Sequence, residues 1–240
     1  MSNCAIVGHD GHRARAFVLR GGRVADSAHG PDRDAALAAL VAVPERVFHI
    51  GDGAPDNLPT PLLPNTPARG LPGLTQNSPA DVIDGWVRLM LLGFVEAQPD
   101  WDGVALVLTD QLSHWVHLSA REAVSCQSFL TPRLIAALGG TLPADMGAIG
   151  DSLSRPERLA AHLRSAEVSG RAGAIAGYLI GAELAAARPY WLGQSVALID
   201  GGGSGAGHAE ALEAQGVPVS RHDPEAILST ALAALGERIG

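Results

Sequence analysis

The sequence predicts a mixed α/β fold built as two successive halves. Short apolar segments, typical of buried strands, alternate with alanine-rich segments of helical periodicity. The same order, strands first and helices after, occurs before and after Pro99. Because each block can bury its helices against its own sheet, we expect two related α/β domains, residues 1–98 and residues 99–240.

Turn and breaker residues delimit the elements expected in the first half. In order these are a β-hairpin over residues 4–24 with strands at 5–7 and 15–19, a helix over 32–43, a short buried strand over 46–50, a proline-rich extended segment over 54–79 and a helix over 80–98. The last helix is amphipathic, with Val82, Trp86, Leu89 and Phe94 expected to face the core.

The second half is expected to contain more helix than the first. Its elements are strands at 104–108, 115–118 and 123–125, helices at 131–138, 155–165 and 170–187, a strand at 196–199, a helix at 206–215, a short strand at 217–219 and a final helix at 224–238. Within the third of these helices, residues 175–184 carry glycine and alanine, which predicts that another backbone comes close. Glu183 is interpreted as a structural residue of that helix.

Composition excludes several classes of function. The formal net charge is −8, which argues against sequence-independent binding to nucleic acid. No apolar run is long enough to span a bilayer, and the N-terminus lacks the pattern of a secretory signal, so we expect a cytoplasmic protein. Its 2 cysteines are too few for a disulfide framework or a zinc site. All 17 basic residues are arginine, so no lysine can hold a phosphate.

A cluster of glycines, Gly201-Gly202-Gly203-Ser204-Gly205, follows the apolar segment 196–199 and precedes a predicted helix. The amides of such a turn can hold a phosphate, or the bare backbone can pack flat against an adenosine. The glycine spacing does not give the dinucleotide-binding pattern, and too little chain follows for the remaining βαβ units. A tight turn without a ligand stays open as the alternative.

The region from residue 176 to residue 216 resembles a known family. Residues 176–184, Ala-Gly-Tyr-Leu-Ile-Gly-Ala-Glu-Leu, are followed by the glycine turn and then by Ala211-Leu212 and Gly216, in the order and near the spacing of the 2-dehydro-3-deoxygalactonokinases. The resemblance implies a two-lobed actin-like ATPase (ribonuclease H-like) fold with a central cleft. It also implies ATP-dependent phosphorylation of 2-dehydro-3-deoxy-galactonate with Mg²⁺, in galactonate catabolism.

Elsewhere the sequence is similar to the family at glycine and apolar positions but differs at polar ones. The family's first phosphate loop begins with an aspartate where this chain has Gly8, and Asp10 lies two positions later. Asp84 stands where the family has arginine, and Trp86 replaces a glutamate. His114 replaces the family's lysine, and a histidine is largely neutral at pH 7.

The resemblance also implies the residues of a site. Asp10, Asp84 and Asp110 are the candidate catalytic carboxylates, Gly11, His12, Gly201, Gly202, Gly203 and Ser204 the candidate nucleotide contacts, and Ser113 and His114 the candidate substrate contacts. His9, Asp10 and His12 could instead bind a metal, but three neighbouring loop residues rarely point at one ion, so no protein metal site is predicted. The expected partners are a small sugar acid and a nucleotide, without nucleic acid or membrane, and a homodimer is left open.

Two alternatives to the kinase function stay open. The replaced aspartate, glutamates and lysine would each lower the rate, which favours a kinase-fold protein that no longer transfers phosphate and acts as a binding or regulatory module, a pseudokinase. A rebuilt site that phosphorylates a different small substrate explains the substitutions equally well. Nucleotide binding without transfer would support the module, and transfer to another acceptor would support the rebuilt kinase.

Overall fold

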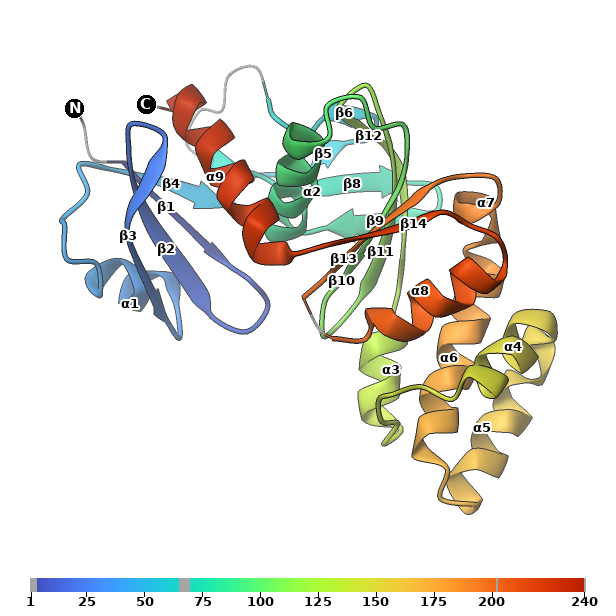
Figure 1. The fold of residues 1–240 in the computed structure, drawn as a ribbon. Helices are drawn as coiled ribbons and strands as arrows, with labels where there is room; N and C mark the ends of the chain where they lie inside the picture. The colour runs from blue at the N-terminus through green and yellow to red at the C-terminus, as the bar shows by residue number, and fades with distance from the viewer. Residues whose placement is uncertain (1–3, 65–69, 202, 240) are drawn as a thin grey trace. The chain divides into compact units, whose positions relative to one another are not determined.

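The structure is a computed structural model that describes residues 4–64, 70–201 and 203–239. The chain forms two compact units, labelled here unit 1 and unit 2 (Figure 1). Unit 1 takes the chain up to Asp102 together with Leu118–Cys126 and the segment from Asp223 onward, and unit 2 takes Gly103–His117 and Gln127–His222. The predicted boundary between residues 98 and 99 lies close to Asp102, where the chain first passes from unit 1 to unit 2. The prediction treats the halves as consecutive in the sequence, whereas each unit is built from separate segments of the chain. Each unit is described by itself.

Unit 1 contains most of the strands and three of the described helices. Its elements are β1 (Cys4–His9), β2 (Ala14–Arg20), β3 (Arg23–Gly30), α1 (Arg33–Ala38), β4 (Arg46–Ile50), β5 (Asp56–Asn57), β6 (Thr60–Pro61), β7 (Gly70–Leu71), β8 (Leu74–Asn77), β9 (Ala80–Ile83), α2 (Gly85–Ala97) and α9 (Pro224–Ile239). All of these strands except β6 form a five-stranded sheet of order β3-β2-β1-β4-β7 and a three-stranded sheet of order β5-β8-β9, while β6 pairs antiparallel with Glu122 and Ala123 of strand β12 (Glu122–Phe129).

The five-stranded sheet of unit 1 is covered on both faces. The predicted hairpin is confirmed, because β1 and β2 pair antiparallel, and β4 adds in parallel to the other side of β1. Alternate residues such as Ala5 and Val7 form a small core with Ala36 of α1. Helices α2 and α9 lie together and pack against β1 and β2 respectively. They pack closely: a Cβ on Gly93 of α2 would lie 2.2 Å from the Ile227 carbonyl oxygen.

Three predictions for the first half were wrong. The helix expected over residues 32–43 is α1, which ends at Ala38. Residues 80–98 are not one helix: β9 comes first and pairs antiparallel with β8, and α2 begins only after Asp84, whose carboxylate accepts a hydrogen bond from the Val87 amide. Val82, expected in the core, is 57% exposed on β9. Strand β3 was missed because it is an edge strand with few apolar residues, and pairing with β2 decides its conformation.

The proline-rich segment is ordered around one buried arginine. Arg88 of α2 is 0% exposed. Its guanidinium donates to the carbonyls of Leu62 at 3.0 Å, Pro61 at 2.8 Å and Pro72 at 3.2 Å, and to the Asp56 carboxylate at 2.7 Å. Backbone carbonyls that have no ladder partner are therefore satisfied by a side chain of α2.

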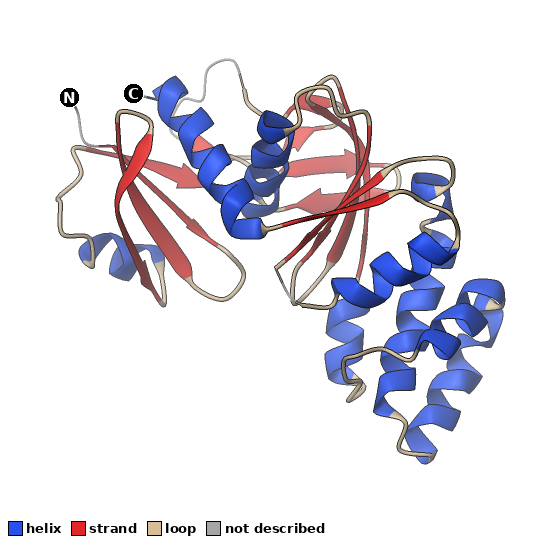
Figure 2. Ribbon diagram, viewed as in Figure 1, coloured by secondary structure: helices blue, strands red, loops and turns tan. Residues whose placement is uncertain are grey.

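Unit 2 follows the predicted order more closely. Its elements are β10 (Gly103–Leu108), β11 (Ser113–Ser119), β12 (Glu122–Phe129), α3 (Thr131–Ala137), α4 (Met146–Ser154), a 3₁₀ turn (Pro156–Arg158), α5 (Leu159–Val168), α6 (Ala172–Ala186), α7 (Arg188–Trp191), β13 (Val196–Asp200), α8 (Gly205–Ala214) and β14 (Val219–His222). Strands β10, β13 and β14 run parallel. The β11–β12 hairpin carries its tip, Leu118–Cys126, into unit 1. The mixed α/β fold class is confirmed in both units (Figure 2).

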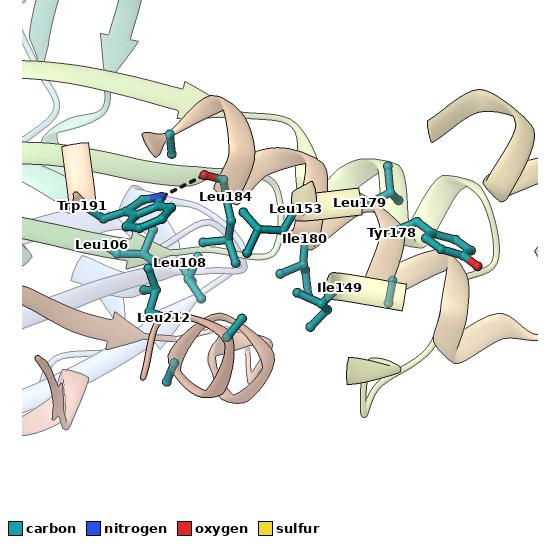
Figure 3. Close-up of a cluster of buried hydrophobic side chains, with 14 of the residues drawn as sticks. Leu106, Leu108, Ile149, Leu153, Tyr178, Leu179, Ile180, Leu184, Trp191 and Leu212 are labelled. Carbon is teal, nitrogen blue, oxygen red and sulfur yellow. Dashed lines mark hydrogen bonds between the residues drawn. The ribbon is translucent and has the colours of Figure 1, made fainter. Parts of the chain in front are cut away.

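A helical layer packs on one face of the unit 2 sheet. Leu106 and Leu108 of β10 contribute to a cluster with Ile180 of α6, Leu212 of α8 and Trp191 (Figure 3). The indole of Trp191 donates a hydrogen bond to the Leu184 carbonyl at 2.8 Å. This core packs α6 and α8 against the sheet that contains β13. The strand before the glycine turn and the helix after it are therefore both held by the same core.

The close approach predicted for residues 175–184 is confirmed, although the partner helix was missed. A Cβ on Gly177 would lie 2.4 Å from the Asp145 carbonyl oxygen, and one on Gly181 would lie 2.2 Å from the Ile149 carbonyl oxygen. Both carbonyls belong to the start of α4 and its cap. The sequence of α4 contains two glycines and three polar residues in its nine, which hid its helical pattern.

In the parts of the chain that the structure describes, no helix combines the length and the apolar character needed to cross a bilayer.

Candidate functional site

Unit 1 contains a pocket of about 410 Å³ beside the first hairpin turn and the start of α2. Residues from several segments line it: His9, Gly11, Arg33, Ile50, Gly51, Gly53, Pro55, Gly73, Val82, Ile83, Asp84, Gly85 and Trp86. Glycine is required at its rim, because a Cβ on Gly85 would lie 2.4 Å from the Gly51 nitrogen and one on Gly73 would lie 2.3 Å from the Ile83 oxygen. Close backbone packing at these two glycines therefore shapes the wall of the pocket.

Asp84 brings a carboxylate to this pocket. One of its oxygens accepts the Val87 amide at 2.9 Å, which caps the N-terminus of α2, and the residue is exposed. Asp84 is therefore the candidate carboxylate that a pocket ligand can reach.

Asp10 lies between two lining residues, His9 and Gly11, but its carboxylate is occupied. Oδ1 accepts the amides of His12 and Arg13, each at 2.9 Å, and the other oxygen lies 4.0 Å from the Arg13 guanidinium. Asp10 thereby closes the turn between β1 and β2. Gly11 has a φ of +102°, which explains the glycine. His12 is exposed in the same turn.

Arg33, at the start of α1, is the cation of the pocket lining. Its guanidinium donates to the Ile50 carbonyl at 2.6 Å and is paired with the Asp52 carboxylate. Asp52 also lies 3.6 Å from the His49 ring. The charge of Arg33 is thus largely matched within unit 1. Arg33 was not predicted as a site residue, because it lies in none of the motifs found in the sequence.

In unit 2 the glycine turn is held by Asp200, the last residue of β13. The carboxylate of Asp200 accepts the Gly203 amide at 2.7 Å and the Gly205 amide at 2.8 Å. The Gly201 amide donates to the Leu108 carbonyl at 3.2 Å. These three amides are therefore used inside the protein. Asp200 could have been selected from the sequence, because it directly follows the apolar strand and precedes the glycines. Gly202 lies outside the described residues.

The turn still offers an open surface and one hydroxyl. Gly203 has a φ of +75°, and a Cβ there would have no neighbour within 4 Å. Ser204 is 8% exposed, and its hydroxyl has no hydrogen-bond partner in the described structure. Ser204 directly precedes the ten-residue helix α8 but does not cap it with its side chain. A buried hydroxyl without a partner at the end of a glycine turn is unusual and suggests a ligand.

Behind the turn, unit 2 contains a buried charged cluster centred on Glu183 of α6. Its carboxylate accepts hydrogen bonds from the Ser113 hydroxyl at 2.7 Å and the Trp115 indole at 2.9 Å. The ring of His208, on α8, places Nε2 3.3 Å from Oε1 of Glu183. Both side chains are 1% exposed. The predicted structural role of Glu183 is thus more specific than a core-lining position.

The two charges of this cluster stabilise each other. Burial alone would raise the pKa of Glu183, but the charge of His208 and hydrogen bonds from His208, Thr131 and Ser113 outweigh it, so the pKa is lowered. Burial alone would lower the pKa of His208, but the Glu183 carboxylate outweighs it, so the pKa is raised. Glu183 and His208 therefore form a buried ion pair at neutral pH.

The residues predicted to contact the substrate, Ser113 and His114, are buried in this structure. Ser113 is 0% exposed and bonded to Glu183, and His114 is 1% exposed with Nδ1 2.7 Å from the Ser128 hydroxyl. Both residues lie at the start of β11, where both faces of the strand are buried, so neither side chain reaches the surface. Asp110 is exposed in the turn between β10 and β11. Asp110 and the glycine turn belong to unit 2, whereas Asp10 and Asp84 belong to unit 1.

Metal coordination by protein side chains alone finds no support. Among the described residues, no group of three or more histidine, cysteine, aspartate or glutamate side chains could hold an ion. The alternative of a metal bound by His9, Asp10 and His12 is not borne out by this geometry, since Asp10 is engaged by its own turn. Magnesium that arrives with a nucleotide needs only one or two carboxylates besides phosphate oxygens.

Comparison with known structures defines the class. A protein from Sinorhizobium meliloti provisionally assigned as a 2-dehydro-3-deoxygalactonokinase superposes with a TM-score of 0.80 at 21% identity, covering 100% of this chain and 99% of that chain. Component A of the Acidaminococcus fermentans (R)-2-hydroxyglutaryl-CoA dehydratase gives 0.54 at 12% identity, covering 98% and 96%. The activator of the 2-hydroxyisocaproyl-CoA dehydratase from Clostridium difficile, solved with ADPNP, gives 0.54 at 11% identity, covering 98% and 95%. The chain has the fold of the actin-like ATPases and sugar kinases.

A family match lies in the sequence of unit 2 and α9. Residues 154–235, about a third of the chain, match the family model for 2-keto-3-deoxy-galactonokinase. This is the family that the sequence resembles. No curated protein matches the chain. The matched range contains Glu183, Asp200, the glycine turn and His208, so the family signal covers the unit 2 site rather than the unit 1 pocket.

Proposed function

We propose that the protein is an ATP-dependent sugar-acid kinase that phosphorylates 2-dehydro-3-deoxy-galactonate. The family match and the sugar-kinase fold support a sugar kinase. The single observation that carries the proposal is the Asp200–Gly205 turn, where the unpartnered Ser204 hydroxyl lies inside the family-matched segment. Galactonate catabolism and a cytoplasmic location are part of the same proposal.

The residues of the turn fit the nucleoside part of ATP better than its phosphates. A phosphate cradle needs free amides, and those of Gly201, Gly203 and Gly205 are already bonded. A Cβ at Gly203 would meet no atom within 4 Å, which leaves room for a base, and the buried Ser204 hydroxyl next to it has no partner in the described structure and is the group we assign to a ribose or ring nitrogen. ATP, when bound, supplies the transferred phosphoryl group and carries Mg²⁺ on its phosphates.

The unit 1 pocket supplies the acceptor chemistry in this proposal. A kinase needs a carboxylate that takes the proton of the attacking hydroxyl. Asp84 lines the pocket, is exposed and uses one oxygen to cap α2, whereas Asp10 does not line the pocket and accepts two amides of its own turn. We therefore assign the base role to Asp84, and to Asp10 the role of fixing the turn that carries Gly11 and His12.

Binding is tested by calorimetric titration with Mg·ATP of the wild type, Ser204→Ala and Ser152→Ala. Ser152 is a matched control, since its hydroxyl is also buried without a partner, in α4. Both variants remove an unsatisfied buried group, so neither should lower the stability of the free protein. Only Ser204→Ala should weaken the binding of ATP, by about tenfold, because about one hydrogen bond is lost. Equal affinity of both variants would contradict the assigned nucleotide contact.

Transfer is tested by coupled ADP release with 2-dehydro-3-deoxy-galactonate. Asp84→Asn keeps a good helix cap and removes the base, so kcat should fall about 10²–10⁴-fold with ATP affinity unchanged. Asp110→Asn, at an exposed turn of unit 2, should keep the wild-type kcat. If Asp84→Asn retains full turnover, the base assignment is wrong.

A second function has its own supporting observation. Asp10, which lies nearest to the position of the family's lost aspartate, is committed to its own turn. That favours a catalytically impaired module that binds nucleotide without transferring phosphate. Binding of Mg·ATP with no ADP release on any sugar acid would support the module, and release with a different sugar would support a kinase of another specificity. Absence of binding would remove both kinase proposals.

A further inference from the structure

The buried ion pair of unit 2 lies directly behind the glycine turn. Glu183 belongs to α6 and His208 to α8, one helical turn after Ser204. Nδ1 of His208 lies 3.4 Å from the Ser204 carbonyl oxygen, and Nε2 lies 3.3 Å from Oε1 of Glu183. The imidazole therefore spans from the carboxylate to the last residue before α8.

The two neighbours of the ring determine its protonation. A carboxylate oxygen and a backbone carbonyl oxygen can only accept hydrogen bonds. A neutral imidazole carries one N–H, so either tautomer would leave a lone pair facing one of these oxygens. The Nε2–Glu183 contact at 3.3 Å has the distance of an ion pair but not the geometry of a hydrogen bond. A protonated ring leaves no lone pair facing either oxygen, and a buried carboxylate at this distance favours a cationic His208.

Glu183 and the turn each have partners besides His208. Ser113 and Trp115 of β11 donate to Glu183, and Thr131 of α3 adds a third hydrogen bond. In the turn, the Asp200 carboxylate accepts the Gly203 and Gly205 amides, and the His208 ring contacts the Ser204 carbonyl. His208 is therefore the side chain that links the buried Glu183 carboxylate to the turn.

We propose that the Glu183–His208 ion pair positions the Asp200–Gly205 turn, so that the turn keeps its ligand-binding shape only while His208 is protonated. Glu183 and His208 act through the turn and are positioning residues. The statement about nucleotide rests on the proposed function, whereas the statement about the order of the turn does not.

Other charges around His208 are few and leave this pair dominant. The elements that pack on α8 are α4, α6, β13 and β14. Their titratable groups are Asp151, Tyr178, Glu183, Asp200, Arg221 and His222. Asp200 acts on His208 in the same direction as Glu183. Asp151 is exposed, Arg221 lies 3.6 Å from Glu213 at the surface, and burial lowers the pKa of His222 and keeps it neutral.

The first test is nitrogen-15 NMR of the histidine rings of the full chain between pH 6 and pH 9. His208→Gln identifies the resonance. The proposal expects two protonated ring nitrogens on His208 at pH 7.5 and loss of one proton at higher pH. A ring that is neutral at pH 7 would overturn it. This measurement uses the wild-type fold, so it stays decisive even if a variant does not fold.

The second test follows the turn without nucleotide. Hydrogen exchange of the amides of residues 201–206, corrected for the intrinsic pH dependence of exchange, should accelerate above the titration of His208 in the wild type. His208→Gln and Glu183→Gln should exchange fast at every pH. His222→Gln removes a half-buried histidine of β14, bonded to Ser220 at 2.9 Å, and should behave as the wild type. Unchanged protection in His208→Gln would refute the positioning role.

The third test links the pair to nucleotide. Mg·ATP affinity should fall about tenfold as His208 deprotonates and should be low and independent of pH in His208→Gln and Glu183→Gln. The double variant should bind no more weakly than either single variant, because one interaction is lost in all three. Additive losses would contradict a shared interaction. If the wild type binds no ATP, the proposed function fails, whereas the exchange experiment still decides the positioning role.

Discussion

The contact between α4 and α6 gives the sharpest prediction, the substitution Gly181→Ala. A Cβ on Gly181 would lie 2.2 Å from the Ile149 carbonyl oxygen and 2.9 Å from the Ser152 Cβ. Packed carbon atoms normally keep about 3.5–4.0 Å, so the two helices must separate by about 1 Å or more. Such overpacking typically costs about 1–3 kcal/mol, occasionally more.

Helix propensity opposes this cost and must be subtracted. Alanine is about 1 kcal/mol better than glycine inside a helix. With a packing cost at the upper end of its range, Gly181→Ala should lose about 2 kcal/mol net. Gly150 provides the matched control on the facing helix α4, because it is exposed and a Cβ there meets nothing within 4 Å. Gly150→Ala should therefore gain about 1 kcal/mol.

The assay is thermal unfolding by circular dichroism, with hydrogen exchange of α4 as the local readout. For a chain of this size about 1 kcal/mol shifts Tm by about 2–4 °C. Gly181→Ala should melt about 4–8 °C below the wild type and Gly150→Ala about 2–4 °C above it. Exchange should accelerate in α4 only for Gly181→Ala. A Gly181→Ala protein that melts at or above the wild-type temperature would refute the close-packing argument.

Three further predictions concern the polar interior. Arg88→Met removes the donor shared by several carbonyls and Asp56, and should cost about 3 kcal/mol, with faster proteolysis of residues 56–77 than in the wild type. Asp200→Asn can keep one of its two amide bonds at most, so Mg·ATP affinity by calorimetry should fall about tenfold while Tm changes by a few degrees only. The ion pair predicts a pH window: the lowered pKa of Glu183 contributes stability that is lost as pH falls below its ordinary 4.5, and the raised pKa of His208 contributes stability that is lost as pH rises through a value above 6.5. Urea titrations from pH 4 to pH 9 should therefore show stability declining on both sides, and the decline at high pH should be absent in His208→Gln.

The sequence predicted the elements whose signal is local. Strand β4 has the predicted bounds, and the strands and helices of unit 2 other than α4 and α7, which were not predicted, lie within a few residues of their predicted ranges. Apolar strands and alanine-rich helices carry their period in neighbouring residues. Tertiary pairing decided the rest. Residues 80–83 follow a helical pattern yet form β9, since β8 offers a ladder and Asp84 caps the helix that follows.

The candidate site was predictable only in part, for a related reason. Asp84 was selected from its place in a family motif and does line a pocket. Ser113 and His114 were selected in the same way, but a motif does not say on which side of a strand a polar residue points, and both are buried. The Glu183–His208 pair could not be found, because 25 residues of sequence separate partners that meet only when α6 and α8 pack.

The positions at which the chain resembles the family have a structural explanation. This explanation limits what the resemblance can say about activity. Gly73, Gly85, Gly177 and Gly181 are all positions where a Cβ would come within 2.2–2.4 Å of backbone, so glycine there is demanded by packing whatever the protein catalyses. A match at such positions is evidence for the fold. Activity depends instead on polar atoms that the packing does not need, above all the Ser204 hydroxyl, which costs stability while it has no partner. Ser204→Ala therefore separates the two: a gain in stability with a loss of ATP affinity would show that this residue is retained for a ligand and not for the fold.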